Sequence, residues 1–258
     1  MRNILYMFFL GMFILLSGCV TLYKPNAICS PLLKEKGELN ATAALGLSGC
    51  CLYNVQAAYA VTDHVGLMID GMYHNRHYTS ADSSEEKLNI FSGEAGAGYF
   101  TTFGEEKKGL FQCYGGVGYG NTIDRITNSP NSYPQVSAEY YNLFIQPGIA
   151  YTKPNFEIAG DVRMNYVNVY NIQANLYDKF EWWNTDFRYY SDTSLNFVNL
   201  EPTMTMKAGG KNLKGIVQCG VTIPVINSQS YFIVNSASML GLPLFKFSVG
   251  MCYTFGRK

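Results

Sequence analysis

The residue with the most definite chemistry in this sequence is Cys19, a thiol that directly follows Leu16-Ser17-Gly18. The hydrophobic run Ile4–Leu16 precedes it, and the positively charged Arg2 precedes the run. This run is about as long as the hydrophobic region of a signal peptide and too short to span a bilayer comfortably. The two small side chains before Cys19 give a peptidase access to the bond. We therefore expect cleavage there and export of the chain from the cytoplasm.

The pattern around Cys19 resembles the lipobox of bacterial lipoprotein signal peptides. The resemblance implies that the Cys19 thiol is acylated, with palmitate as a typical acyl chain, and that the mature chain begins at this residue. Val20 is not acidic, so the same resemblance gives no reason to expect retention in the inner membrane. The alternative is an ordinary secretory signal that contains a cysteine by chance.

Two histidines, His74 and His77, flank Asn75-Arg76 and lie near Asp70 in the sequence. Such a pair beside an acid is a candidate for a general base with its orienting group, or for a metal site. Residues three apart on a strand or loop do not face each other, however, and no nucleophile motif accompanies them. We therefore interpret them as solvated loop histidines and expect no catalytic residue, no metal or other cofactor, and no enzymatic activity.

Aromatic residues concentrate in one stretch of the chain, which also holds both tryptophans. Exposed aromatic loops are common binding surfaces, because rings supply a large contact area at little entropic cost. The hypothesis is a site for a glycan, lipopolysaccharide or a protein. The alternative is that the rings pack on each other or extend an aromatic girdle. The candidate residues are Tyr177, Phe180, Trp182, Trp183, Phe187, Tyr189 and Tyr190.

The composition excludes several classes of protein. Removal of residues 1–18 from the 258-residue chain leaves 240 residues, enough for one large β domain or two small ones. The formal net charge is +0, so no nucleic-acid partner is expected. The chain has 20 tyrosines, 16 phenylalanines and 25 glycines, and it lacks a second long apolar segment. A helical membrane protein is therefore not expected.

Alternation of apolar and polar residues predicts the secondary structure. In 156–166 the odd-numbered residues are polar or small and the even-numbered residues are mostly apolar, a period of two that is typical of strands. The same pattern predicts strands over 38–46, 52–61, 65–73, 88–103, 109–121, 137–152, 156–169, 195–208, 213–226 and 244–255.

Connections between these strands alternate between short and long. The short ones are 62–64, 104–108, 153–155 and 209–212, and the long ones are 74–87, 122–136, 170–194 and 227–243. The first connection, 47–51, is intermediate. All short turns and both ends of the chain are therefore expected on one side of the sheet.

Aromatic residues of the apolar parity fall in pairs near the strand ends, eight to ten residues apart. At about 3.3 Å per residue and a tilt near 40°, such a pair spans roughly 20–25 Å, close to the apolar band of an outer-membrane barrel. The pairs are Phe91 and Tyr99, Phe111 and Tyr119, Tyr141 and Tyr151, Phe156 and Tyr166, and Phe245 and Phe255.

From Glu38 to Phe255 the chain resembles small bacterial outer-membrane β-barrel proteins, in a lipidated version. We expect an all-β fold: an antiparallel transmembrane β-barrel of about ten strands, with eight as the alternative. Residues 1–18 are the expected signal peptide, 19–37 a lipidated tether and 38–258 the barrel domain. The expected location is the bacterial outer membrane, with the N-terminus on the periplasmic side and membrane lipid as a partner.

The expected role is structural or surface-binding, through the long outer loops. One alternative is a small passive pore, and another is a soluble, lipid-tethered β-sandwich that acts as a binding module.

Charged residues on the polar parity would face the interior of such a barrel, because charges that face lipid are costly. The favoured interpretation is a structural network that fills a narrow lumen, since about ten strands enclose little more than side chains can fill. The alternative is a selective pore. The charged candidates are Asp70, Glu94, Glu157, Asp161, Arg163, Glu201, Lys207, Lys214 and Lys246. The same parity holds Gln56, Gln112, Gln146 and Gln218, and glycines 96, 98, 116, 118 and 120 leave either a cleft or room for large residues opposite.

Overall fold

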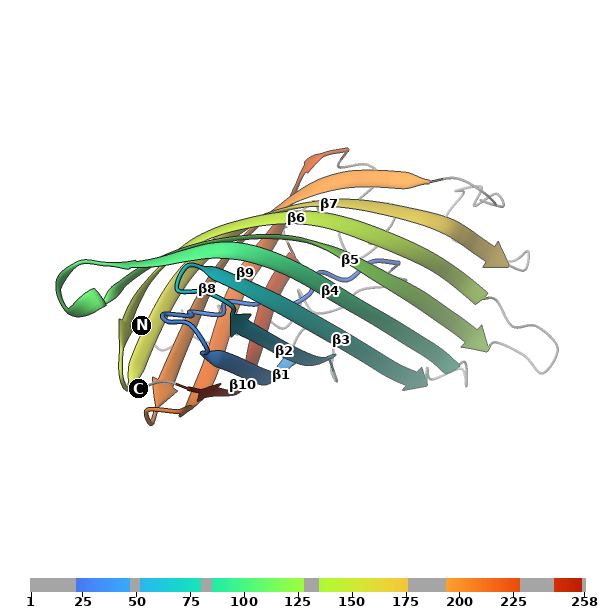
Figure 1. Cartoon of the computed structure of the whole chain (residues 1–258). Helices are drawn as coiled ribbons and strands as arrows, with labels where there is room; N and C mark the ends of the chain where they lie inside the picture. The colour runs from blue at the N-terminus through green and yellow to red at the C-terminus, as the bar shows by residue number, and fades with distance from the viewer. Residues whose placement is uncertain are drawn as a thin grey trace, which may run out of the picture.

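A computed structural model describes residues 22–46, 52–79, 85–127, 135–175, 194–227 and 244–256. Within these ranges ten antiparallel strands form one closed barrel, because each strand pairs with its neighbours in sequence and β1 pairs with β10 (Figure 1). The strands are β1 (Leu39–Gly46), β2 (Leu52–Ala60), β3 (Val65–Thr79), β4 (Glu85–Phe103), β5 (Gly109–Thr127), β6 (Gln135–Lys153), β7 (Phe156–Asn175), β8 (Leu195–Gly209), β9 (Leu213–Ile226) and β10 (Leu244–Phe255). The predicted all-β barrel of ten strands is confirmed, and neither eight strands nor a two-sheet sandwich describes this structure.

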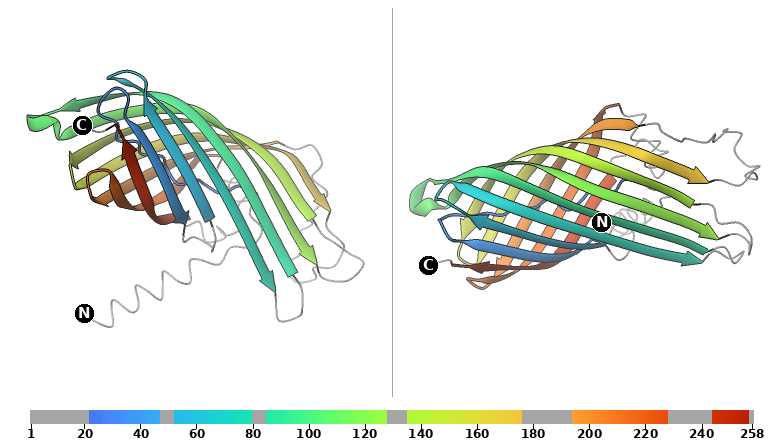
Figure 2. Two further views of the ribbon diagram at one scale, coloured as in Figure 1. Left: turned by 60° about the horizontal axis from the view of Figure 1, so that its bottom comes forward. Right: turned by 45° about the vertical axis from the view of Figure 1, so that its right-hand side comes forward.

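The strands β3, β5 and β7 each continue six residues beyond their predicted ends. The ladder between β3 and β4, for example, runs on through Asn75↔Asn89 and Arg76↔Leu88. The extensions of β3 and β5 carry polar residues on both parities, and in β7 the exposed Asn171 and Gln173 are polar, so no outward apolar face marks the extensions in the sequence. The result is a slanted barrel, with a tall wall at β4 to β7 and a low wall at β10, β1 and β2 (Figure 2).

All four short connections lie at one end of the barrel, which we call the short-turn end (left in Figure 1). The connection between β4 and β5 holds a 3₁₀ turn, η1 (Glu105–Lys107), and Phe255 at the end of β10 pairs with Leu39 at the same end. The opposite end, where β3, β5 and β7 finish, is the long-loop end. None of the described residues belongs to a helix long and apolar enough to cross a membrane.

Residues 22–33 lie inside the barrel and 34–37 lead out of it, which differs from the tether expected between lipid and first strand. The segment runs through the interior from the long-loop end to the short-turn end (blue in Figure 1). Ile28 and Leu33 are completely buried, and Leu32 is almost so. A tether in water would expose these apolar side chains, whereas the lumen removes them from water, which favours the folded position. We call residues 22–37 the plug.

Gly37 makes the turn that joins the plug to the barrel wall. Its φ of 85° lies in the left-handed region that glycine adopts without strain, and its N–H donates to the Ala60 carbonyl at 2.9 Å. The chain thereby reverses direction at the short-turn end, and β1 begins two residues later at Leu39. The plug and the wall are thus one continuous chain folded back on itself.

Candidate functional site

The lumen contains all nine charged residues that the sequence singled out. Eight of them are buried, and the Lys246 side chain is 12% exposed. Six of the nine form ion pairs across the lumen: Arg163 Nη1 with Glu94 Oε2 at 2.8 Å, Lys214 Nζ with Glu157 Oε1 at 2.7 Å, and Lys246 Nζ with Glu201 Oε2 at 2.8 Å. Such pairing is what allows charge to persist away from water.

Arg163, on β7, is the most heavily engaged of these charges. Besides its bond to Glu94, its Nε and Nη2 both donate to Gln146 Oε1, at 3.1 and 3.0 Å. Its guanidinium lies 4.3 Å from the centroid of the Phe144 ring, within reach of a cation–π interaction. The side chain is 1% exposed, so its position is defined on every side by protein groups.

The other three predicted charges, Asp70, Asp161 and Lys207, interact with the plug or with residues that hold it. Asp70 accepts hydrogen bonds from Asn26 and from Asn54 on β2. Lys207 Nζ donates to the carbonyl of Ser30 at 2.9 Å. Asp161 accepts a hydrogen bond from Gln112 Nε2 at 2.8 Å.

Glutamines of the wall hydrogen-bond to the backbone of the plug. Gln218 does so in both directions, because its Nε2 donates to the Ile28 carbonyl at 2.8 Å and its Oε1 accepts from the Ile28 N–H at 3.0 Å. Gln146 Nε2 donates to the Cys29 carbonyl at 2.8 Å. A primary amide has both donors and an acceptor, like the peptide group it binds. The wall thereby satisfies backbone groups that would be costly to bury alone.

Two further glutamines do the same for neighbouring plug residues. Gln56 Nε2 donates to the Ala27 carbonyl at 3.3 Å. Gln112 Oε1 accepts from the Leu32 N–H at 3.3 Å, while its Nε2 donates to Ser30 Oγ at 3.1 Å. All four glutamines of the polar parity therefore contact one short stretch of the plug.

Apolar side chains anchor the plug at both ends of the lumen. Toward the long-loop end, Tyr23 packs edge-on against Tyr140 and Phe197, with ring centroids 5.1 and 5.5 Å apart. Toward the short-turn end, Leu32 and Leu33 belong to a buried cluster with wall residues of β2 to β7. The plug is thus held by packing as well as by hydrogen bonds.

The glycines of β4 and β5 make room for large side chains. A Cβ at Gly98 would clash with the Tyr114 ring, and one at Gly120 would clash with the Tyr140 ring. A Cβ at Gly116 would lie 2.7 Å from the Phe144 ring. Of the two possibilities left open by the sequence, the structure shows room for neighbours rather than a cleft.

A small space remains beside the plug near the low wall, between Pro25 and Ala27 on one side and Gly46, Leu52 and Lys246 on the other. Its volume of about 20 Å³ accommodates about one water molecule. A solute larger than water therefore has no room in this space.

The histidines at the end of β3 do not form a site together. His74 is buried in the lumen, where its Nε2 lies 3.3 Å from Lys24 Nζ. His77 is on the outer face, and its Nε2 lies 3.5 Å from Glu85 Oε2. Their opposite orientation follows from their odd spacing along a strand. In the part of the chain that the structure describes, no three His, Cys, Asp or Glu residues group as a metal site.

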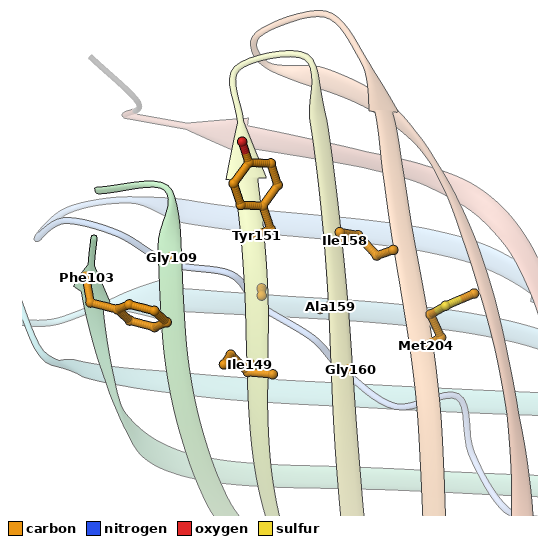
Figure 3. A pocket seen from close by; sticks show the side chains of 9 residues that line it. Phe103, Gly109, Ile149, Tyr151, Ile158, Ala159, Gly160 and Met204 are labelled. Atoms are coloured by element: carbon orange, nitrogen blue, oxygen red, sulfur yellow. The ribbon is translucent and has the colours of Figure 1, made fainter. Parts of the chain in front are cut away.

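The outer face of the barrel is apolar and carries one shallow recess near the short-turn end (Figure 3). Phe103, Ile149, Tyr151 and Met204 surround it, and Gly160 forms part of its floor. Its volume is about 460 Å³, and its lining is almost entirely apolar.

Cys19 lies outside the described residues, as do the seven aromatic residues Tyr177, Phe180, Trp182, Trp183, Phe187, Tyr189 and Tyr190. Their roles therefore remain predictions from the sequence.

The sequence analysis missed the plug itself. Two signals for it are present: apolar residues such as Leu22, Ile28 and Leu33 in a segment interpreted as a tether, and four glutamines facing the lumen. Glutamine carries no charge to pair with another wall residue, so inward glutamines are compatible with a polar backbone inside the barrel, as they are with water.

No family model matches the chain, and no curated protein matches it. Several solved structures are similar in fold. The translocator domain of the autotransporter NalP from Neisseria meningitidis is 10% identical, with a TM-score of 0.46, covering 84% of this chain and 86% of that one. Acinetobacter baumannii CarO is 11% identical, with a TM-score of 0.33, covering 87% of this chain and 99% of that one. The N-terminal β-barrel domain of Pseudomonas aeruginosa OprF is 10% identical, with a TM-score of 0.31, covering 84% and 96%.

Proposed function

We propose that this chain is a lipid-anchored β-barrel of the bacterial outer membrane, closed by its own N-terminal plug, with a structural or surface-binding role. The observation that carries the proposal is the inversion of the barrel, which is apolar outside and charged inside. Val55, Ile69 and Met251 are more than 60% exposed on the outer face, whereas Arg163 and Lys214 are buried within. In water this arrangement would be unfavourable, but in a bilayer it is the stable one.

The predicted aromatic pairs support the membrane location. Phe91 with Tyr99 and Phe245 with Phe255 are each 48–58% exposed on the outer face. Their spacing gives an apolar band of roughly 20–25 Å along the barrel axis, close to that of known outer-membrane barrels. On this basis the short turns face the periplasm and the long loops face outward.

The filled lumen favours a structural role over the passive pore. Three buried ion pairs and the glutamine contacts occupy the interior around the plug. A solute would have to displace the plug and break these contacts. We therefore assign any interaction with a glycan, lipopolysaccharide or a protein to the long outer loops, with the aromatic stretch of residues 177–190 as the candidate surface.

The lipid anchor is proposed on Cys19, because the preceding residues match a lipobox. Metabolic labelling with a radioactive fatty acid tests it directly: the wild-type chain should be labelled, and a Cys19→Ala variant should not. Equal labelling of both chains would refute the anchor.

Electrophoresis of membrane extracts with and without boiling tests the barrel. A folded outer-membrane barrel should migrate differently before and after boiling. The same shift should occur in the Cys19→Ala variant, which carries no lipid label. Absence of the shift, with the chain recovered in a soluble fraction, would contradict the membrane location and favour a tethered soluble protein.

A further inference from the structure

We infer that the N-terminal end of the mature chain, with any lipid on Cys19, lies at the long-loop end of the barrel and therefore on the cell surface. The inference rests on the proposed function for the lipid and for the orientation of the barrel. It reverses the sequence-based expectation that this end lies on the periplasmic side, and it follows from the path of the plug.

The plug crosses the lumen in one direction, as its successive contacts with the wall show. In chain order these contacts are Leu22 with Thr122, Tyr23 with Asn165, Lys24 with His74, Asn26 with Asp70, Cys29 with Gln146, Ser30 with Gln112 and Lys36 with Asp63. Thr122 lies five residues before the end of β5 at the long-loop end, and Asp63 lies in the short connection between β2 and β3. The chain therefore enters at the long-loop end and leaves at the short-turn end.

Chain length prevents the N-terminal end from returning to the short-turn end. Only Val20 and Thr21 lie between Cys19 and Leu22, and the three residue-to-residue steps reach at most about 11 Å when fully extended. The thirteen residue-to-residue steps along β5 from Thr122 back to Gly109 cover about 43 Å, or roughly 30 Å along the axis of a barrel with tilted strands. The chain between Cys19 and Leu22 is therefore about threefold too short to return along the axis, and the plug itself fills the return path.

The plug is enclosed when the barrel closes. It joins β1 through Gly37, and β1 completes the barrel by pairing with β10 over Leu39–Gly46. The bonds from Gln218, Gln146 and Lys207 to successive plug residues hold it in place afterwards. The side on which the N-terminal end emerges is therefore decided as the barrel assembles.

An epitope inserted between Val20 and Thr21 tests this topology in whole cells. The matched control carries the same epitope between Gly210 and Lys211, in the short connection between β8 and β9. We expect antibody to bind the first variant on intact cells and the second only after the outer membrane is permeabilised. Binding of the first variant only after permeabilisation, with the heat-dependent shift retained, would overturn the inference and leave the barrel intact. Loss of the shift in the untagged chain would instead refute the proposed function, and the inference with it.

A single-residue variant covers the case in which the epitope prevents folding. Thr21→Cys, in a chain with Cys50→Ser and Cys51→Ser, offers a thiol to a membrane-impermeant maleimide, with Lys211→Cys in the same background as the control. The remaining cysteines of the described residues are buried or half-buried in the barrel. Labelling of position 21 on intact cells at least fivefold above position 211 supports the inference, and the reverse ratio contradicts it.

Discussion

Substitution of the ion pair between Arg163 and Glu94 tests whether the lumen is a structural network or a conducting pore. The relevant variants are Glu94→Gln, Arg163→Met and the double substitution, which together form a double-mutant cycle. The two groups are 2.8 Å apart, and their side chains are 1% and 6% exposed. In a dry lumen, each single variant leaves one charge buried without its partner.

The magnitudes follow from what remains around each charge. Removal of one partner from a buried pair costs about 3–5 kcal/mol. In Glu94→Gln the Arg163 guanidinium still donates two hydrogen bonds to Gln146 Oε1, so we expect a loss near the lower limit. In Arg163→Met the Glu94 carboxylate keeps the hydrogen bond from Asn142 Nδ2 but lies in register with the acidic Asp70, so we expect a loss near the upper limit. The double variant should be more stable than Arg163→Met alone, because no unpaired charge is left.

Urea titration of the heat-dependent band in detergent or lipid measures these free energies of unfolding, and planar bilayers measure conductance. A structural lumen predicts large, strongly non-additive losses and no conductance in the wild type. The reasoning would be refuted if both single variants lost less than about 1 kcal/mol, additively, and changed a measurable conductance. That result would mean that water reaches the pair and that the lumen is a pore.

Three further predictions use the same stability assay or a binding assay. Gln218→Ala should lower the free energy of unfolding by about 1–3 kcal/mol, because it removes both hydrogen bonds to Ile28. Gln173→Ala, on the exposed end of β7, should change this free energy little. Gly98→Ala should lower the free energy of unfolding by about 1–3 kcal/mol, because the added Cβ meets the Tyr114 ring. Gly160→Ala should be neutral, because nothing lies within 4 Å of its added Cβ. Equal losses in the two variants would contradict this account of the packing. Removal of residues 181–191 should abolish binding in a screen of glycans, lipopolysaccharide and surface proteins while the heat-dependent shift persists; unchanged binding would exclude this loop.

The barrel could be predicted from the sequence because its two faces meet different surroundings. In β7 the lumen-facing Glu157, Asp161 and Arg163 alternate with Val162 and Met164, which face outward. A strand with one face toward lipid and one toward polar groups produces this period of two regardless of its partners. An even number of strands then allows β1 to pair antiparallel with β10, as the structure shows.

The plug could not be predicted in the same way, because its contacts are not periodic. Ile28 is bound by Gln218, 190 positions away, and Cys29 by Gln146, 117 positions away. Pro25 and Pro31 interrupt any regular pattern, and the segment forms no strand or helix of its own. Its position depends on a cavity that exists only after all ten strands have paired.

The inner face of this barrel shows why polarity alone does not distinguish a pore from a plugged barrel. A lumen filled with water and a lumen filled with backbone both require polar walls, so Gln146 and Gln218 are compatible with either. The distinction lies in how the polar groups are satisfied. Here Gln218 matches both the N–H and the carbonyl of Ile28, and Arg163, Lys214 and Lys246 each meet a carboxylate on another strand. Because these contacts join the wall to the plug, loss of the plug would leave wall glutamines without the partners that the structure shows.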